Sequence, residues 1–285
     1  MKKIVVVGAK GQLGLCIKAL SNGYPSLDFL FLDSNALDVS SAKQVETLFR
    51  NTPFDYCINC AAYTAVDKAE DEKQLAYKIN TLGVKFLAES CKKHQVTLIH
   101  ISTDFVFDGK STTPYKEKDV THPLGVYGAT KLAGEKEIAF TLKNYYILRT
   151  SWLYSHFGSN FVKTMLRLAK EKKELNVVND QIGTPTYGPD LADVIFKIIL
   201  FGPTKYGLYH FSNLGSTTWY EFARAIFEMT NANIEVHPVD SNTFVTKAER
   251  PKYSVLDKSK IMATFGIEIP TWRESLEKMV TAMET

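Results

Sequence analysis

The chain has 285 residues, 45% of them hydrophobic and 23% charged, and this balance excludes disordered, collagen-like and coiled-coil proteins. Its net charge of +3, from 34 Lys and Arg against 31 Asp and Glu, is too small for a nucleic-acid-binding surface. The longest apolar stretch, residues 194–201, contains Lys197 and is too short for a membrane span. The residues before Gly8 are too few for a signal peptide, so we expect a soluble, cytoplasmic protein.

The first half of the chain alternates short apolar runs with helical patterns, which is typical of βαβ units and a parallel sheet. The predicted strands are residues 3–7, 29–32, 56–60, 97–102 and 145–149. The predicted helices are residues 12–21, 41–51, 71–93 and 128–141, the second capped by Ser40 or Ser41. Because crossovers between parallel strands are right-handed, we predict an α/β fold with a doubly wound, Rossmann-type parallel sheet.

The pattern changes after residue 152. Helices are predicted at residues 160–171, 190–201, 218–230 and 273–283, separated by loops rich in Pro and Gly. We expect a dinucleotide-binding domain at residues 1–151, to which a later segment near 187–212 can return. Residues 152–285 are expected to form a smaller, mostly helical and discontinuous substrate-binding lobe.

The four cysteines do not form a disulfide framework in a chain of this length. Cys57 and Cys60 have the spacing of a redox or zinc motif, but a zinc site needs a second pair of ligands, and the sequence has no other CxxC. They lie in a run of small residues that indicates a buried strand. We therefore interpret them as buried structural thiols.

A glycine-rich turn follows the first predicted strand. Gly8, Gly11 and Gly14 form GxxGxxG, a spacing variant of the dinucleotide fingerprint. Glycines there allow a tight turn, close approach of the backbone to a pyrophosphate, and close packing of the helix on the strand, and the helix N-terminus offers free N–H groups. Asp33, after the second strand, is near the position expected for an acidic residue that binds a ribose diol.

A second pattern indicates ketone chemistry. Tyr127 and Lys131 form YxxxK at a helix start, so the ammonium can approach the phenol, and Thr103 ends a strand where an open α/β sheet places its cleft. Reduction of a ketone needs a hydride and a proton, and positive charge near Tyr127 would lower its pKa. The roles of two residues stay open. Trp152 is either a core aromatic or a cleft residue, and Arg250 either binds a pyrophosphate or is a surface charge.

Together these stretches resemble the extended short-chain dehydrogenase/reductase superfamily and, within it, the dTDP-4-dehydrorhamnose reductase family. The matching segments are residues 8–14, 61–70, 102–109, 127–135, 149–154, 179–186 and 250–251. The cofactor-binding residues that the resemblance implies are Gly8, Gly11, Gln12 and Leu13 at the phosphates, Asp33 at the adenosine ribose, Asp38 and Val39 at the adenine, Ala62, Tyr63 and Thr64 along the cofactor, and Tyr127 and Lys131 at the nicotinamide end. The implied catalytic residues are Tyr127 as proton donor, Lys131 and Thr103, and the implied sugar-binding residues are Thr103, Asp104 and Trp152, with Asn80 in a supporting role.

The resemblance implies reduction of the 4-keto group of dTDP-4-dehydro-β-L-rhamnose, a nucleotide sugar, with NADPH or NADH. Two alternatives stay open: a sugar-nucleotide epimerase or dehydratase of the same superfamily, and a non-catalytic regulatory subunit like that of methionine adenosyltransferase. Some relatives are dimers bridged by magnesium through glutamates, one of them at the position of Cys16, and a thiol is a poor magnesium ligand. We therefore expect no metal, and a monomer or weak homodimer.

Overall fold

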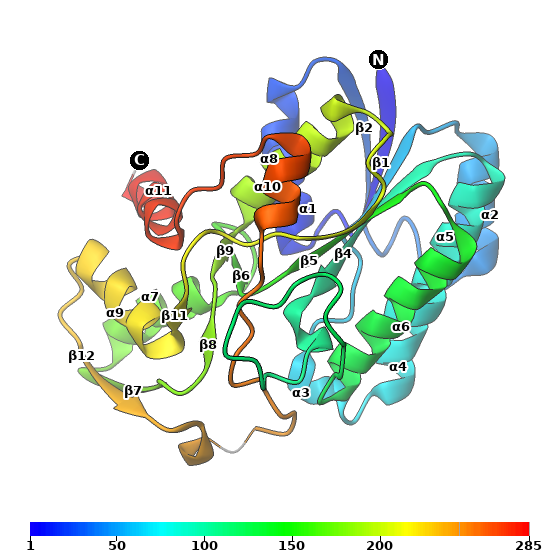
Figure 1. The fold of residues 1–285 in the computed structure, drawn as a ribbon. Coiled ribbons are helices and arrows are strands. Elements are labelled where there is room, and N and C mark those ends of the chain that lie inside the picture. Colours follow the sequence, from blue (N-terminus) through cyan, green and yellow to red (C-terminus); the bar gives the residue numbers. More distant parts are fainter. Residues whose placement is uncertain (245, 285) are drawn as a thin grey trace.

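The computed structural model describes residues 1–244 and 246–284, and at its centre lies a six-stranded parallel sheet ordered β10-β5-β4-β3-β1-β2 (Figure 1). Its strands are β1 (Lys2–Val7), β2 (Leu27–Leu32), β3 (Tyr56–Asn59), β4 (Thr97–Thr103), β5 (Tyr145–Thr150) and β10 (Gly207–His210). After β2 the chain returns past β1 to build the rest of the sheet on its other side. The loops that follow β1 and β3 therefore diverge at a topological switch point, where open α/β sheets bind ligands.

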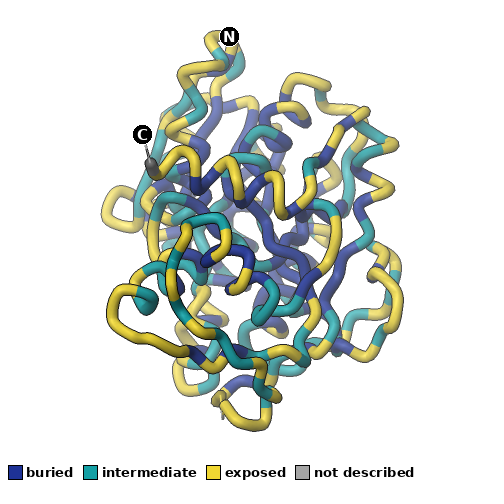
Figure 2. Tube along the Cα trace, turned by 90° about the vertical axis from the view of Figure 1, so that its left-hand side faces the viewer, coloured by how far each residue is buried: buried dark blue, intermediate teal, exposed yellow. Residues whose placement is uncertain are grey.

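Both faces of the sheet are covered by helices, because the strands are apolar on both sides. In β1, Ile4 and Val6 pack on one face and Val5 and Val7 on the other, all fully buried. The first face packs on α1 (Gln12–Leu20), α8 (Gly188–Phe201) and α10 (Ser259–Phe265), the second on α2 (Ala42–Asn51), α5 (Val84–Lys93) and α6 (Val126–Thr141). Figure 2 shows buried segments of the chain at the centre and exposed segments around them. The predicted doubly wound fold is confirmed.

The predicted helix at residues 71–93 differs in detail. It begins at Lys73 and consists of α4 (Lys73–Tyr77), a π-helical turn η2 (Lys78–Gly83) and α5, after the separate short helix α3 (Val66–Ala69). The π-helical turn projects the Asn80 carbonyl oxygen toward α6, where a Cβ at Gly134 would lie only 2.3 Å from it. Tertiary packing therefore sets this local geometry, which the helical periodicity alone does not reveal.

Strand β10 is absent from the predicted strands, although it lies within the segment near 187–212. Its four residues, which follow a Gly-Pro turn, pair with β5 at the sheet edge, with Leu208 opposite Ile147. Helix α8, just before it, packs against α1. So short a run carries little periodicity, and its place is set by pairing with a strand far away in the sequence.

The remaining residues form a lobe beside the carboxyl ends of the strands (Figure 1). Its helices are α7 (Phe161–Glu171), α9 (Trp219–Met229) and α11 (Trp272–Glu284), which pack together around Phe222 and Leu276. Small two-stranded sheets complete it: β7 (Glu174–Val178) with β12 (Glu235–Val239), β6 (Leu153–Tyr154) with β9 (Thr186–Tyr187), and β8 (Ile182–Gly183) with β11 (Thr217–Thr218). Among the described helices, none combines the length and the apolar character that crossing a membrane requires.

Candidate active site

The glycine turn after β1 is tightly closed. Gly8 has a φ of +75°, and a Cβ there would lie 2.5 Å from the Ala61 backbone nitrogen after β3. A Cβ at Gly14 would lie 2.7 Å from the Gly8 carbonyl oxygen, and the Gly11 N–H donates to that same oxygen at 2.9 Å. Larger side chains at Gly8 and Gly14 would push the turn away from the strand ends.

The first turn of α1 faces the second lobe. Gly11 is the N-cap and offers no side chain, so the first N–H groups of the helix are free to bind an anion. The Gln12 side chain donates to the Leu153 carbonyl oxygen at 3.1 Å and accepts from Asn160 at 2.8 Å. The Leu13 side chain is buried in the core, so only its backbone can reach a ligand. Gln12 thus joins the glycine turn to the lobe.

The acidic residues after β2 are held by local contacts. Asp33 accepts hydrogen bonds from the Asn35 and Ala36 N–H groups and forms an ion pair with Lys10. The Lys10 ammonium holds the pKa of the Asp33 carboxyl below its usual value. Asp38 accepts from the Ser40 hydroxyl and N–H, and this hydroxyl likewise lowers the pKa of Asp38.

Val39, next to Asp38, is buried against Gly83. The predicted adenine site therefore consists of a side chain tied into its own turn, Asp38, and a core residue, Val39. Either of them would contact a ligand only at the edge of this turn.

Residues 61–64 form the loop after β3, in which Ala62 and Tyr63 are half-buried and Thr64 is exposed. Asn80, fully buried in the π-helical turn, clamps this loop: it accepts from the Tyr63 N–H at 2.8 Å and donates to the Tyr63 carbonyl oxygen at 3.1 Å. Its amide also lies 3.1 Å from the Thr130 hydroxyl, on the helix that carries Tyr127. Asn80 thus positions the loop against α6.

Thr103, Asp104 and Tyr127 meet at the end of β4. The Thr103 hydroxyl donates to Asp104 Oδ1 at 3.1 Å and accepts the Phe105 N–H at 3.2 Å. Burial raises the pKa of Tyr127 to about 12; the Thr103 hydroxyl beside it lowers this value in part, and the Asp104 charge adds to the rise. The phenol is therefore protonated at neutral pH.

Asp104 itself is 2% exposed, and its Oδ2 has no partner in good hydrogen-bonding geometry within the described residues. Burial raises the pKa of Asp104 to about 6, although the nearby hydroxyls of Ser254 and Thr103 oppose the shift. A carboxylate with a free, buried acceptor at the end of a central strand is suited to receive a hydroxyl group from a ligand.

Lys131 does not approach the Tyr127 phenol as predicted: no contact among the described residues joins the two groups. Its Nζ donates to the Ile101 carbonyl oxygen at 2.6 Å and lies 3.2 Å from His100 Nε2. Both residues share a face of α6, but the Lys131 side chain is directed to β4. Burial lowers the pKa of Lys131 to about 8.

Trp152 lines a cavity of about 700 Å³ between the strand ends and the second lobe. Its backbone φ is +45°, and its indole stacks on Trp219 with ring centroids 3.5 Å apart and an interplanar angle of 8°. A Cβ at Gly183 would lie 2.5 Å from the Trp152 ring, so only glycine fits there. Phe105, on the loop that leads from Thr103, lines the same cavity.

Arg250 also lines this cavity and is half-buried. Its guanidinium makes a bidentate ion pair with Asp67, at 3.1 and 2.6 Å, and donates to the Ala248 carbonyl oxygen. Lys247 forms a second ion pair with Asp71, so two cations of this loop are fastened to the segment around α3. The surface-charge interpretation is therefore incomplete, because Arg250 forms part of the cavity wall.

The cysteines are embedded in the fold. Cys57 and Cys91 are buried in the core on one face of the sheet, and burial raises the pKa of the half-buried Cys60 well above its usual value. Cys16 lies beneath Gly188, and burial raises its pKa to about 11. Within the described residues, no cluster of three or more His, Cys, Asp or Glu side chains could hold a metal ion.

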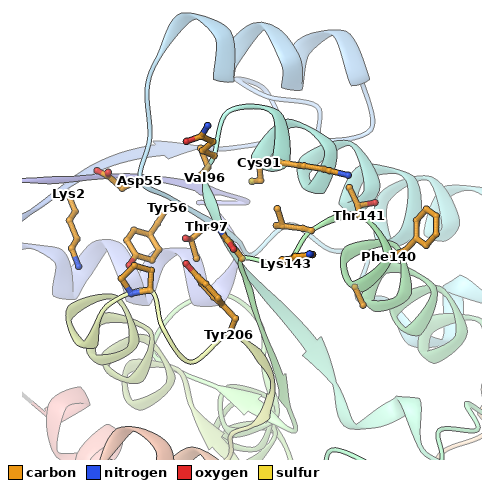
Figure 3. Close-up of a pocket in the computed structure, with 16 residues that line it drawn as sticks. Lys2, Asp55, Tyr56, Cys91, Val96, Thr97, Phe140, Thr141, Lys143 and Tyr206 are labelled. Atoms are coloured by element: carbon orange, nitrogen blue, oxygen red, sulfur yellow. The ribbon is translucent and has the colours of Figure 1, made fainter.

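A second cavity, of about 750 Å³, lies at the amino ends of the strands (Figure 3). Figure 3 shows Lys2, Tyr56 and Tyr206 at one side of it and Phe140 and Lys143 at the other. None of the predicted site residues lines it. Because open parallel sheets bind their ligands at the carboxyl ends of the strands, we place the active site at the Trp152 cavity and the glycine turn.

Sequence reasoning missed three residues of this site. Behind the cleft, His100 contacts both Asn59 and Lys131, and Trp219 stacks on Trp152. The one available signal was His100, a polar residue inside the apolar run 98–101. Trp219, at the start of a helix in the other half of the chain, gave none.

Comparison with known proteins places the chain in a family. The family model described as RmlD substrate binding domain matches residues 1–285. A dTDP-4-dehydrorhamnose reductase from Aggregatibacter actinomycetemcomitans is 42% identical, over 98% of this chain and 98% of the relative. A solved dTDP-4-dehydrorhamnose reductase from Clostridium acetobutylicum superposes with a TM-score of 0.95 at 40% identity, covering 99% of this chain and 100% of its own. The Bacillus anthracis enzyme of the same name, solved in complex with NADP, gives 0.94 at 40% identity and covers 100% of both chains.

Proposed function

The chain belongs to the RmlD substrate binding domain family, and from this premise we propose that it reduces the 4-keto group of dTDP-4-dehydro-β-L-rhamnose to give dTDP-β-L-rhamnose, with NADPH or NADH. One observation carries the proposal. The Thr103 hydroxyl lies beside the Tyr127 phenol at the end of β4, and the glycine turn follows β1 at the same carboxyl edge of the sheet. This is what delivery of a proton to a ketone beside a dinucleotide requires.

The glycine turn fits the dinucleotide. Bound NADPH or NADH supplies a hydride for the carbonyl carbon. Gly8, Gly11 and the backbone of Gln12 and Leu13 would hold the phosphates, because this turn leaves no room for side chains and offers free N–H groups. Further cofactor contacts are proposed for Asp33 at the adenosine ribose, Asp38 and Val39 at the adenine edge, and Ala62, Tyr63 and Thr64 along the loop after β3.

Tyr127 is the proposed proton donor. Its phenol is protonated at neutral pH, as an ordinary tyrosine is, so it can donate as negative charge develops on the substrate oxygen. The neighbouring Thr103 hydroxyl would supply a second hydrogen bond to that oxygen by turning its proton away from Asp104 Oδ1. The Lys131 amine, at the base of the same helix face, would hold the nicotinamide ribose and stabilise the phenolate that remains after transfer.

The Trp152 cavity suits the nucleotide-sugar substrate. Its walls offer flat aromatic surface from Trp152 and Trp219, and cations from Arg250 and Lys252. Aromatic faces accept sugar and base rings, and the Arg250 guanidinium would bind a diphosphate in bidentate fashion by exchanging Asp67 for it. Asp104, at the inner end near Thr103, would accept a hydrogen bond from a sugar hydroxyl.

Oxidation of the cofactor, followed at 340 nm with NADPH and the ketosugar nucleotide, tests the proposal. Absorbance should fall only when both are present; an epimerase or dehydratase shows no net consumption of NADPH, and a regulatory subunit shows no turnover.

The Tyr127→Phe variant tests the role of its phenol. It should lower kcat roughly 10²- to 10⁴-fold and leave the NADPH Kd unchanged, because only the acid is lost. Tyr115→Phe is the matched control, since that phenol bonds Asp108 and Ser111 outside the cleft. Near-normal turnover by Tyr127→Phe would remove it from the proton-donor role.

Domain organisation and assembly complete the proposal. Residues 1–151, with the segment near 187–212, form the dinucleotide-binding unit, and the rest of 152–285 forms the substrate lobe. We also propose a cytoplasmic enzyme that is a monomer or weak homodimer, which sedimentation over a range of protein concentrations tests.

A further inference from the structure

Three polar side chains form a buried row behind the cleft. Asn59 at the end of β3, His100 in β4 and Lys131 in α6 are 2%, 0% and 1% exposed. Asn59 Nδ2 lies 3.0 Å from His100 Nδ1, and His100 Nε2 lies 3.2 Å from Lys131 Nζ. A histidine this deeply buried, with both ring nitrogens engaged, has a defined proton position that the contacts reveal.

The backbone fixes that proton position. The Ala61 N–H donates to Asn59 Oδ1 at 3.0 Å, so the oxygen of this amide faces Ala61 and its NH₂ group faces the imidazole. His100 Nδ1 must therefore accept, and the single proton of the neutral ring sits on Nε2. The ring is neutral because burial lowers the pKa of His100 well below its usual value.

The Nε2–H group points at Lys131, and this limits what the amine can be. An ammonium group has only donors and cannot accept a hydrogen bond, whereas a neutral amine has one lone pair for the imidazole and N–H groups for the Ile101 carbonyl oxygen 2.6 Å away. We propose that His100, oriented by Asn59, is a positioning residue that favours the neutral form of Lys131 and holds the amine against β4 in the free protein. The idea deepens the proposed function, on which its catalytic consequence rests.

Opposing influences act on the protonation of Lys131, and the hydrogen bond from His100 adds to those that favour the neutral amine. Burial lowers its pKa, while Glu135 on α6 and Cys60 after β3 raise it, which leaves the value at about 8. Glu135 is itself fixed by a bidentate ion pair with Arg149, at 2.9 and 2.7 Å. His100 is the group on β4 that faces the amine, and it favours the neutral form.

The proposal has a catalytic consequence. The Tyr127 proton goes to the substrate oxygen, so to stabilise the phenolate that remains, Lys131 must take up a proton from solvent and leave His100. The hydrogen bond from the imidazole therefore contributes to the free energy of protonating Lys131. A residue that only filled space would make no such contribution.

Nitrogen NMR tests the proton position directly. In ¹⁵N-histidine-labelled protein at pH 8.5, the His100 ring, identified by its loss in His100→Gln, should show a protonated Nε2 and an unprotonated Nδ1. The Nδ1–H tautomer, or an imidazolium, would overturn the assignment. This measurement needs no substrate, so it stands even if the proposed reaction is wrong.

The pH dependence of NADPH binding and of turnover tests the function of His100. In His100→Ala, the limb of the pH profile that reports the ionisation of Lys131 should move to higher pH. The kcat should also fall about 10- to 100-fold, because the amine is no longer held in place. His100→Gln, which keeps an N–H donor near Nε2, should recover part of both. His210→Gln removes a similarly buried histidine that contacts Arg149 rather than Lys131, and should lower Tm without moving the limb.

The outcomes separate this inference from the proposed function. If the enzyme consumes NADPH with the ketosugar nucleotide but the limb stays in place in His100→Ala, the role of His100 is wrong and the reaction stands. If no protein consumes NADPH, the reaction is wrong, and the ring tautomer still decides the structural part of the inference.

Discussion

Replacing Asp104 by Asn should stabilise the protein at neutral pH while weakening its activity. The Asp104 carboxyl is buried, and burial raises its pKa from an ordinary 3.8 to about 6. A raised acid pKa means that the native state binds the proton more tightly than the unfolded chain. The stabilising contribution of the protonated carboxyl is therefore fully present below about pH 4 and is lost as the pH rises through 6.

The size of the effect follows from the shift. About two pKa units, at roughly 1.4 kcal/mol each, give a cost of about 3 kcal/mol for the charged carboxylate above pH 6. Asn is neutral at every pH and close to the same shape, and the Thr103 and Ser254 hydroxyls can reverse their hydrogen bonds toward it. The variant should gain on the order of 5 °C in Tm at pH 8, with most of the gain gone near pH 4.

Thermal unfolding of both proteins between pH 4 and pH 8 measures this difference. Asp108→Asn is the matched control, four residues on in the same loop. The hydrogen bond from the Lys110 N–H is the main cause of the lowered pKa of Asp108. Removing the Asp108 carboxylate should therefore destabilise the protein at neutral pH. A gain for Asp104→Asn that does not vary with pH, or a loss at pH 8, would refute the burial argument.

Activity should move in the opposite direction. If Asp104 accepts a hydrogen bond from the sugar, the neutral amide binds it less strongly, and kcat/KM should fall roughly 10-fold or more while the NADPH Kd stays unchanged. A stabilised variant with lower activity is what a buried, incompletely paired carboxylate at a binding site predicts, because such groups are retained at the expense of stability.

Three further changes test other parts of the site. Asp33→Ala removes a carboxylate that repels a 2′-phosphate and frees Lys10, so the ratio of kcat/KM for NADPH to that for NADH should rise; a fall would place Asp33 away from the ribose. Gly183→Ala should displace Trp152 and raise the calorimetric Kd for the nucleotide sugar but not for NADPH. Treatment with EDTA should change neither sedimentation nor turnover, since the buried Cys16 thiol is no magnesium ligand; loss of both would contradict this expectation.

The sheet and the cofactor turn could be predicted from the sequence because their signals are local. Gly8 and Gly14 are needed where the chain turns within a few residues, and the apolar runs of a doubly covered parallel sheet are continuous. Ser41 indeed caps the second helix, accepting from the Gln44 N–H. Such features depend on neighbours in the sequence, so a single chain displays them.

The direction of Lys131 could not be predicted in this way. Helical spacing puts it on the same face as Tyr127, but the side chain is drawn to the Ile101 carbonyl oxygen and to His100, both on a strand that packs behind the helix. Spacing along a helix predicts which residues can meet, and the buried groups opposite decide which of them do. Buried partners of this kind come from other elements, and periodicity says nothing about them.

The sequence left two interpretations open for Trp152, a core aromatic and a cleft residue, and the structure combines them. A bulky residue in the left-handed region costs roughly 1–3 kcal/mol and persists only where its surroundings impose it. Trp219 covers one part of its indole and Gly183 packs against the ring, so the side chain is fixed like a core residue. The same ring lines the cavity. The partners of Trp152 come from distant segments of the chain, so its role could not be predicted from the sequence. The residue forms a wall of the cleft that core-like packing holds rigid. Contacts outside the reacting centre offset the strain of its backbone.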